Sequence, residues 1–180
     1  MSIRQSLLTL LVEGDRHGYQ LRQDFEARTA GTWPVNIGQV YTTLNRLVRD
    51  GLAVEVGKRD DGSVVYRVTD AGRDEVTRWW RTPVDRSTPA RDEMAIKLAL
   101  ALTAPGVDVA AVIQVQRSEV LTALQAWTRE KAALADPPRD GELARLLVLD
   151  NLIFSAEAEI RWLDHCEQRL ATTTTGAPRR

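Results

Sequence analysis

Five side chains between positions 39 and 49 share hydrogen-bonding ability and a spacing that would place them on one side of a helix. They are Gln39, Thr42, Asn45, Arg46 and Arg49. The apolar residues between them recur at intervals of three and four and would form the opposite face. These are Ile37, Val40, Leu44, Leu47 and Val48. No Asp or Glu occurs between Ala27 and Arg49. Because phosphates repel carboxylates and major-groove base edges offer donors and acceptors, this surface is typical of a helix that reads DNA.

Each polar residue type on this face has its own chemistry toward DNA. Gln39 and Asn45 can pair with adenine edges, and Arg46 can pair with guanine. Thr42 can contact a thymine methyl or a phosphate. Tyr41 lies at the edge of the apolar stripe, where its ring can pack while its hydroxyl reaches a phosphate. A solvated face of an ordinary core helix is the alternative, and the acid-free stretch and the neighbouring elements favour DNA over it.

The segments around this helix have the order of a winged helix-turn-helix. Asn36 is a suitable N-cap for the reading helix, and Gly51 can end it in the left-handed conformation. After Gly51 the apolar period changes from 3.6 to 2, and Asp61-Gly62 predicts a hairpin turn. The expected elements are helices over 3–13, 18–29, 37–50 and 70–81 and a two-stranded hairpin over 52–69. Three helices followed by a hairpin predict a winged helix-turn-helix over residues 1–81.

The predicted hairpin carries both signs of charge. Its strands are marked by alternating apolar residues, Leu52, Val54 and Val56, then Val64, Tyr66 and Val68. Lys58, Arg59 and Arg67 could contact a minor groove or phosphates. Asp60 and Asp61 occupy the turn and would be repelled there. The tip therefore either avoids the DNA backbone or approaches it without these carboxylates, and a hairpin that merely covers the core is the alternative.

The overall composition limits the class of protein. The chain has 180 residues and a net charge of −1, and residues 1–81 hold 12 Lys and Arg against 11 Asp and Glu. Any DNA affinity must therefore come from the placement of charges and not from bulk charge. The single cysteine, Cys166, rules out an intramolecular disulfide, and His17 and His165 lack partners at metal-ligand spacing. We expect no metal or cofactor, no enzymatic activity, and a cytoplasmic protein without signal peptide or membrane span.

The second half of the chain is predicted to be helical and to form a dimer. After a linker over 82–91, helices are expected over 92–103, 108–135 and 142–171, and a disordered tail over 172–180. In the last helix, apolar residues at spacings of three and four predict a dimer contact. They are Leu146, Leu149, Ile153, Ile160 and Leu163. A second apolar surface includes Leu143, Leu147, Phe154 and Trp162. An intrachain hairpin with the helix over 108–135 is the alternative, and both arrangements can hold together.

Four tryptophans are candidates for a ligand site. Trp79 and Trp80 end the fourth helix, and Trp127 and Trp162 lie in the two long C-terminal helices. Rings between the DNA-binding part and the dimer helices would suit a flat aromatic or hydrophobic ligand. Burial in a core is the alternative for each ring.

Three motifs resemble those of PadR-family transcriptional regulators. They are HGYQL at 17–21, GQVYTTLNRLVRDGL at 38–52 and VYRVTDAG at 65–72, in the family's order. The stretch 92–171 resembles the helical dimerisation domain of that family. The resemblance therefore covers residues 3–171 and implies a mainly α fold with a small β-hairpin: a winged helix-turn-helix followed by an α-helical dimerisation domain.

The resemblance also implies a function. Members of the family are dimeric repressors of palindromic operators, and a small phenolic or hydrophobic molecule often releases them. By position, the side chains that would face DNA are Tyr19, Gln39, Tyr41, Thr42, Asn45 and Arg46. The wing departs from the family pattern, because this chain has RDDGSVV where relatives are more basic. A winged helix that docks on protein and not on DNA is the alternative, favoured by the near-neutral charge of residues 1–81.

Overall fold

The computed structural model describes residues 3–87, 91–134, 138–139 and 142–175. The chain divides into two compact units, residues 1–86 and 87–180. That division falls within the stretch 82–91, which was predicted to be a linker. Three stretches lie outside the described residues: 88–90 of that linker, most of 136–141 between the last two predicted helices, and 176–180 of the predicted tail.

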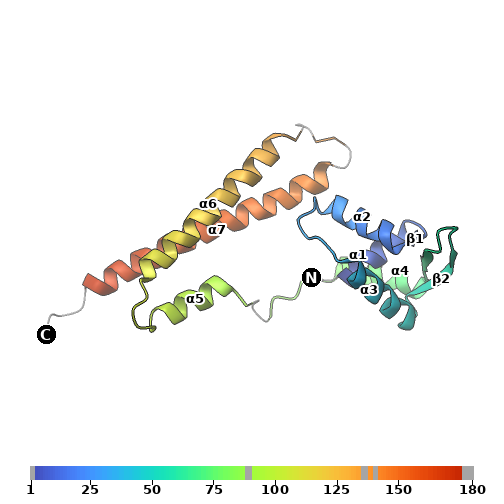
Figure 1. Ribbon diagram of the computed structural model, residues 1–180, viewed down its shortest axis with the longest axis horizontal. Helices are drawn as coiled ribbons and strands as arrows, with labels where there is room; N and C mark the ends of the chain where they lie inside the picture. The colour runs from blue at the N-terminus through green and yellow to red at the C-terminus, as the bar shows by residue number, and fades with distance from the viewer. Residues whose placement is uncertain (1–2, 88–90, 135–137, 140–141, 176–180) are drawn as a thin grey trace. The chain divides into compact units, whose positions relative to one another are not determined.

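The first unit is a winged helix built around one apolar core. Its helices are α1 (Ile3–Val12), α2 (Gly18–Arg28), α3 (Ile37–Arg49) and α4 (Asp70–Arg81). The four helices predicted from the apolar periodicity are all present, with ends that differ by at most one residue. Leu8, Leu21 and Leu44 are completely buried where α1, α2 and α3 meet. This shared core joins α1, α2 and α3 (Figure 1) and fixes the orientation of α3. The polar side of α3 is left exposed as a result.

The predicted two-stranded hairpin is present, and the sheet has a third strand that the sequence did not predict. Arg16–His17 form a short strand, β1, which pairs antiparallel with β3 (Val64–Val68). Strand β2 (Ala53–Lys58) pairs with the other edge of β3, so the order is β1-β3-β2. Two residues are too few to create a visible alternation in sequence. Only the free edge of β3, supplied by the fold, gives them partners.

The inward face of β2 also differs from the predicted alternation. Ala53 is buried, while Val54 and Val56 are about 40% exposed. A bulge between Glu55 and Gly57 shifts the register against β3. In β3 the alternation holds, since Tyr66 and Val68 are buried. The valines of β2 reflect strand propensity and do not mark the core side of that strand.

The second unit is a helical hairpin with one shorter helix packed on it. It contains α5 (Glu93–Ala101), α6 (Val109–Ala132) and α7 (Glu142–Thr175). Side-chain pairs along α6 and α7 run in opposite directions, from Gln116–Glu159 to Lys131–Asp150, so the two helices are antiparallel (Figure 1). α7 continues through Thr175, and the prediction of a disordered tail from residue 172 is wrong for 172–175. Although α7 has 34 residues, no described helix is apolar enough over sufficient length to cross a membrane.

Candidate nucleic-acid interface

Local interactions define both ends of α3. The Asn36 side-chain oxygen accepts a hydrogen bond from the Gly38 amide at 2.7 Å. At the other end Gly51 has φ of +73°, and the Leu52 amide donates to the Leu47 carbonyl at 2.9 Å. This is a Schellman cap, which the glycine permits because it has no Cβ. Both cap predictions are confirmed. The caps fix the two ends of α3, which has 13 residues.

The predicted reading surface of α3 is exposed. Val40, Leu44 and Leu47 are fully buried on one side. The residues predicted to face DNA are all exposed: Gln39, Tyr41, Thr42, Asn45, Arg46 and Arg49. The Thr42 hydroxyl donates to the Gly38 carbonyl at 2.8 Å, which leaves its methyl group for an apolar contact. The helix therefore presents amide, methyl and guanidinium groups together, the groups that discriminate base edges in a major groove.

The two arginines of this surface differ in their partners. Within the described residues Arg46 makes no ion pair, so its guanidinium is available to a base or a phosphate. Arg49 donates to Asp50 at 3.0 Å, and Asp50 also accepts from Arg4 of α1 at 3.0 Å. Asp50 thus neutralises part of the charge at the C-terminal end of α3. Arg46 is the stronger candidate for base recognition.

Helix α2 positions two tyrosines near this surface. A Cβ atom on Gly18 would lie 2.7 Å from Cε1 of the Tyr41 ring, so the ring packs directly on the Gly18 backbone and would have to move to admit a larger residue. His17 caps α2, because its Nδ1 accepts from the Gln20 amide at 3.3 Å. Tyr19 is 47% exposed, and the Arg22 guanidinium lies 4.9 Å from its ring centroid. Sequence reasoning missed the structural role of His17-Gly18 and the cation at Arg22.

The three predicted cations of the wing differ in their partners. Lys58 and Arg59 are exposed beside the turn. Arg67 donates to both Asp15 carboxylate oxygens, from Nε to Oδ1 at 2.9 Å and from Nη2 to Oδ2 at 2.5 Å, and these bonds hold the pKa of the Asp15 carboxyl below its usual value. Arg67 thus forms an ion pair that joins β3 to the segment before β1, and its DNA contact stays a prediction. Neither proximity in sequence nor periodicity indicates a partner 52 residues away.

The turn of the wing is built by one of the two aspartates. The Asp61 carboxylate accepts a hydrogen bond from the Ser63 amide at 2.9 Å. Hydrogen bonds from Ser63 lower the pKa of the Asp61 carboxyl, so it stays charged at neutral pH. The Asp61 side chain closes the hairpin turn that the Asp61-Gly62 pair predicted. The charge remains close to Arg59 and weakens the attraction of this tip to a phosphate.

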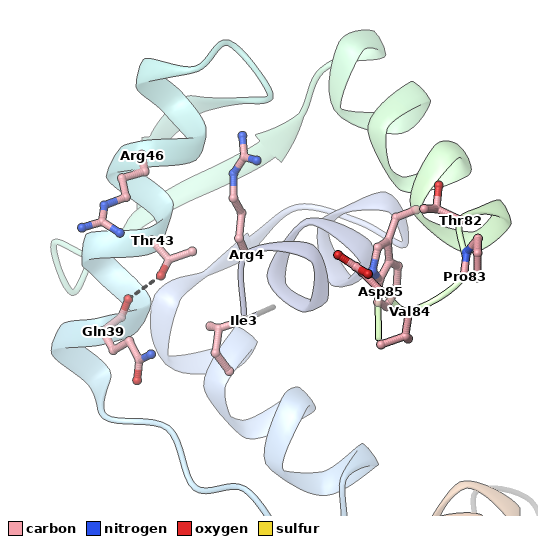
Figure 2. A pocket seen from close by; sticks show the side chains of 10 residues that line it. Ile3, Arg4, Gln39, Thr43, Arg46, Thr82, Pro83, Val84 and Asp85 are labelled. Atoms are coloured by element: carbon pink, nitrogen blue, oxygen red, sulfur yellow. Dashed lines mark hydrogen bonds between the residues drawn. The ribbon is translucent and has the colours of Figure 1, made fainter. Parts of the chain in front are cut away.

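A cavity of about 710 Å³ borders the other edge of α3. Gln39, Thr43 and Arg46 line it from α3, and Trp79 lines it from α4. In Figure 2, Ile3 and Arg4 of α1 stand between these α3 residues and the segment 82–85. Thr43 was not among the predicted residues, although its spacing of four from Gln39 and three from Arg46 places it on the same side. The two reading residues therefore border both the outer surface and this cavity.

The four candidate ligand tryptophans fall into separate places. The Trp79 and Trp80 ring centroids are 4.5 Å apart, and both rings line a pocket of about 280 Å³ in the winged-helix unit. Trp127 lines a different pocket on α6 and α7, and Trp162 packs against the core of the helical unit. The structure brings only Trp79 and Trp80 together.

The predicted dimer residues are partly used within one chain. Leu149 and Leu163 are 2% and 0% exposed in the single chain, so they have no surface left for a partner. The intrachain alternative holds for these two, because α6 packs on this side of α7. Leu146, Ile153 and Ile160 are half-buried. The second apolar surface is free instead: Leu143, Leu147 and Phe154 are 54%, 60% and 65% exposed.

Two family models match the chain, one for each unit. The family described as transcriptional regulator PadR-like matches residues 7–78, and the family described as virulence activator alpha C-term matches residues 90–171. A curated relative, the probable transcriptional regulator Rv1176c of Mycobacterium tuberculosis, is 31% identical over 187 residues, which cover 94% of this chain and 98% of that protein.

Solved structures share the fold over nearly the full length. The virulence activator AphA of Vibrio cholerae has a TM-score of 0.70 and 26% identity, with coverage of 96% of this chain and 99% of that one. PadR of Bacillus subtilis in complex with operator DNA has a TM-score of 0.68 and 19% identity, with coverage of 91% and 94%. The same protein has also been solved in complex with p-coumaric acid, with a TM-score of 0.69 at 19% identity.

Proposed function

Since the chain belongs to the PadR-like family of transcriptional regulators, we propose that it is a homodimeric repressor that binds a palindromic operator through α3 of each subunit. The family is one of DNA-binding regulators and not of enzymes. The observation that carries the proposal is the exposed surface of α3. It offers Gln39, Asn45 and Arg46 and contains no carboxylate before Asp50.

We assign base reading to the polar side chains of α3, and contacts with the DNA backbone to two tyrosines and the wing. Arg46, which has no ion pair among the described residues, is suited to pair with guanine, and Gln39 and Asn45 are suited to adenine. We expect the hydroxyls of Tyr19 in α2 and Tyr41 in α3 to contact phosphates. Lys58 and Arg59 would contribute from the wing. Arg67 is omitted, because its pairing with Asp15 occupies its guanidinium.

The apolar surface of α7 supports a dimer with two equivalent DNA-reading helices. Leu143, Leu147 and Phe154 recur at intervals of four and seven and are more than half exposed. Such a row on one helix is suited to pack against its own copy about a two-fold axis. A symmetric pair of α3 helices would enter successive major grooves, with half-sites about 34 Å apart.

Fluorescence anisotropy with DNA fragments that flank the gene tests the reading role of α3. Arg46→Ala is expected to weaken specific binding by about 1–3 kcal/mol. Arg129→Ala removes the same charge from α6 in the helical unit and serves as the matched control, with little change expected. If both variants bind DNA with the same affinity as the wild type, Arg46 does not read a base.

The salt dependence of binding separates DNA recognition from the protein-docking alternative. The near-neutral charge of residues 1–81 favours that alternative, since 12 basic residues face 11 acidic ones. About 6–8 phosphate contacts per dimer predict a log–log salt slope of about −5 to −7. Binding to no flanking fragment, or binding that salt does not weaken, would support docking on a protein.

We also propose that a small aromatic or hydrophobic molecule releases the repressor from DNA. The p-coumaric acid complex of the Bacillus subtilis neighbour is a property of that protein, and it supports ligand control in this fold. The cavities in both units of this chain provide volumes of the size that small-molecule sites have.

A further inference from the structure

Asp50 places a carboxylate at the end of the reading helix where helix stability favours a cation. It is the C-cap residue of α3, and the last turn of the helix carries Arg46 and Arg49. Because the helix dipole leaves partial negative charge at a C-terminus, an acid is unfavourable there. Phosphates of a bound DNA would repel the same carboxylate. A residue that opposes both helix stability and DNA affinity indicates a different role.

The Asp50 carboxylate holds two arginines that border the reading surface. Its Oδ2 accepts from Nη2 of Arg4 in α1 at 3.0 Å, and its Oδ1 accepts from Nε and Nη2 of Arg49 at 3.1 and 3.0 Å. Arg4 lies beside the reading surface, since it lines the same cavity as Arg46 (Figure 2). Within the described part of the chain, Asp50 is the only acidic partner of either Arg4 or Arg49.

The arginines of this region therefore fall into two groups. Arg46 is exposed and has no acidic partner among the described residues, and it is the one assigned to a base. Arg4 and Arg49 are both held by Asp50. Guanidinium groups at the edge of a DNA interface contact phosphates, which position a protein without reporting the sequence. The fold leaves the base-reading arginine available and occupies two that are suited to phosphates.

We propose that Asp50 is a built-in competitor of DNA phosphates, which holds Arg4 and Arg49 and thereby limits the affinity of this regulator for DNA of any sequence. Sequence-independent binding comes from phosphate contacts, so it is the component that such a competitor lowers. The base contacts of α3 then decide where the protein stays bound. This inference rests on DNA binding through α3, as in the proposed function, but on no particular operator and not on dimerisation.

The pairs of Asp50 are weak enough for DNA to exchange them. The Arg49 side chain is 73% exposed and the Asp50 side chain is 33% exposed. Such pairs contribute little because water and salt screen them, so a phosphate can replace Asp50 as the partner of either arginine. The displaced carboxylate then stays near the phosphates and attracts a cation from solution. This uptake offsets part of the counterion release that drives DNA binding.

Fluorescence anisotropy of the full chain with a random-sequence DNA duplex measures this competition. Asp50→Asn keeps the size of the side chain and removes its charge. We expect the variant to bind the random duplex about three- to tenfold more tightly than the wild type. The log–log salt slope should become more negative by about 1, because no cation is taken up at position 50. A merely structural role of Asp50 would leave this slope unchanged.

Two control variants separate the competition from bulk charge and from folding. Asp74→Asn makes the same change of charge on α4, at an exposed residue that forms no ion pair among the described residues, and should leave affinity and slope nearly unchanged. Asp50→Glu retains the charge and should bind as the wild type does. Thermal unfolding checks that each variant is folded. An equal gain in Asp50→Asn and Asp74→Asn would assign the effect to bulk charge and overturn the proposal.

The two arginines identify the source of the gain. If Asp50→Asn acts by releasing them, Arg4→Gln with Arg49→Gln should remove most of the gain in the Asp50→Asn background. The same two changes should weaken binding less when Asp50 is present, since it already holds both guanidinium groups. This double-mutant cycle isolates the coupling between Asp50 and its partners. A gain that survives the loss of both arginines would overturn the proposal.

Fragments that flank the gene, measured beside the random duplex, keep this inference distinct from the proposed function. If no fragment is preferred over the random duplex and Asp50→Asn still tightens binding, the specific repressor fails while the competition stands. If Arg46→Ala weakens specific binding and Asp50→Asn changes neither affinity nor slope, the competition fails while the proposed function stands. If neither the wild type nor Asp50→Asn binds any duplex, both are overturned.

Discussion

The winged-helix unit and the helical unit bury their apolar side chains in different ways. In the first, residues from every helix and from two strands form one continuous core. In the second, one buried cluster has only four members, Met94, Leu98, Ile113 and Leu163. Large apolar side chains of that unit remain exposed on α7, among them Leu147 and Phe154. The first unit completes its own core and leaves polar groups outside, whereas the second leaves apolar surface that a second copy can cover.

The largest expected effect comes from placing charge on the exposed apolar surface of α7. The double variant Leu147→Glu, Phe154→Glu should be monomeric by sedimentation velocity, because like charges would face each other across a two-fold axis. Its affinity for operator DNA should fall on the order of 10²–10⁴-fold, since the two reading helices are no longer linked. Phe154→Leu keeps the surface apolar and should remain dimeric. A double variant that stays dimeric would place the interface elsewhere.

A core truncation in each unit compares their dependence on packing. Leu44 and Leu163 are both fully buried, in α3 and α7. Leu44→Ala should lower the free energy of unfolding of the winged-helix unit by about 2–5 kcal/mol. Leu163→Ala should do the same for the helical unit and also weaken the dimer. Urea unfolding followed by circular dichroism measures both, and Val54→Ala, at an exposed position, should change stability by less than about 0.5 kcal/mol.

The contact between the end of α3 and the start of α4 should have an intermediate effect. The Thr69 hydroxyl accepts from the Gly72 amide at 3.1 Å and donates to the Gly51 carbonyl at 2.8 Å. Thr69→Ala should therefore cost about 0.5–2 kcal/mol of stability, and Thr69→Ser should retain most of it. The midpoint of thermal unfolding checks this order. Equal midpoints for Ala and Ser would mean that the cap contributes nothing measurable.

The smallest expected effect is a pH dependence of the winged-helix unit. Hydrogen bonds and charge from Arg28, with a contribution from Arg16, lower the pKa of Glu13 below its usual value of 4.5. A lowered carboxyl pKa stabilises the fold above the unfolded pKa, and this stabilisation is lost as pH falls through the folded pKa. The pair is largely exposed, so we expect less than about 1 kcal/mol. Glu13→Gln should reduce the loss of the urea midpoint between pH 6 and pH 3, and an unchanged pH profile would contradict this.

Much of the winged-helix unit could be predicted because its signals are local. The spacing of Val40, Leu44 and Leu47 placed α3 and its buried face. Asn36 and Gly51 marked its ends, and Asp61-Gly62 marked the hairpin turn. Each of these depends on backbone preferences or hydrogen bonds within a few residues. The candidate reading surface followed, because the polar face of a helix is fixed once its apolar face is known.

Several contacts that the sequence did not reveal depend on partners far away in the chain. Arg67, whose DNA contact stays a prediction, pairs with Asp15. Leu149 and Leu163 were expected to face a second subunit and are buried within their own. Strand β1 formed only because β3 offered it a free edge. In each case the sequence contains several residues that could chemically have been the partner, and only the fold selects one of them.

The sequence by itself determined the order of helices and strands, the family resemblance and the carboxylate-free face of α3, since periodicity, caps and turns act over short range. Only the tertiary structure decided which apolar face of α7 is left exposed and which cations are left without a partner. It also placed a cavity between α5, α6 and α7, whose walls come from residues up to 72 positions apart. The physical reason is that each apolar surface or charged group is covered or paired by the group that the fold brings closest, and the sequence does not show which group that is.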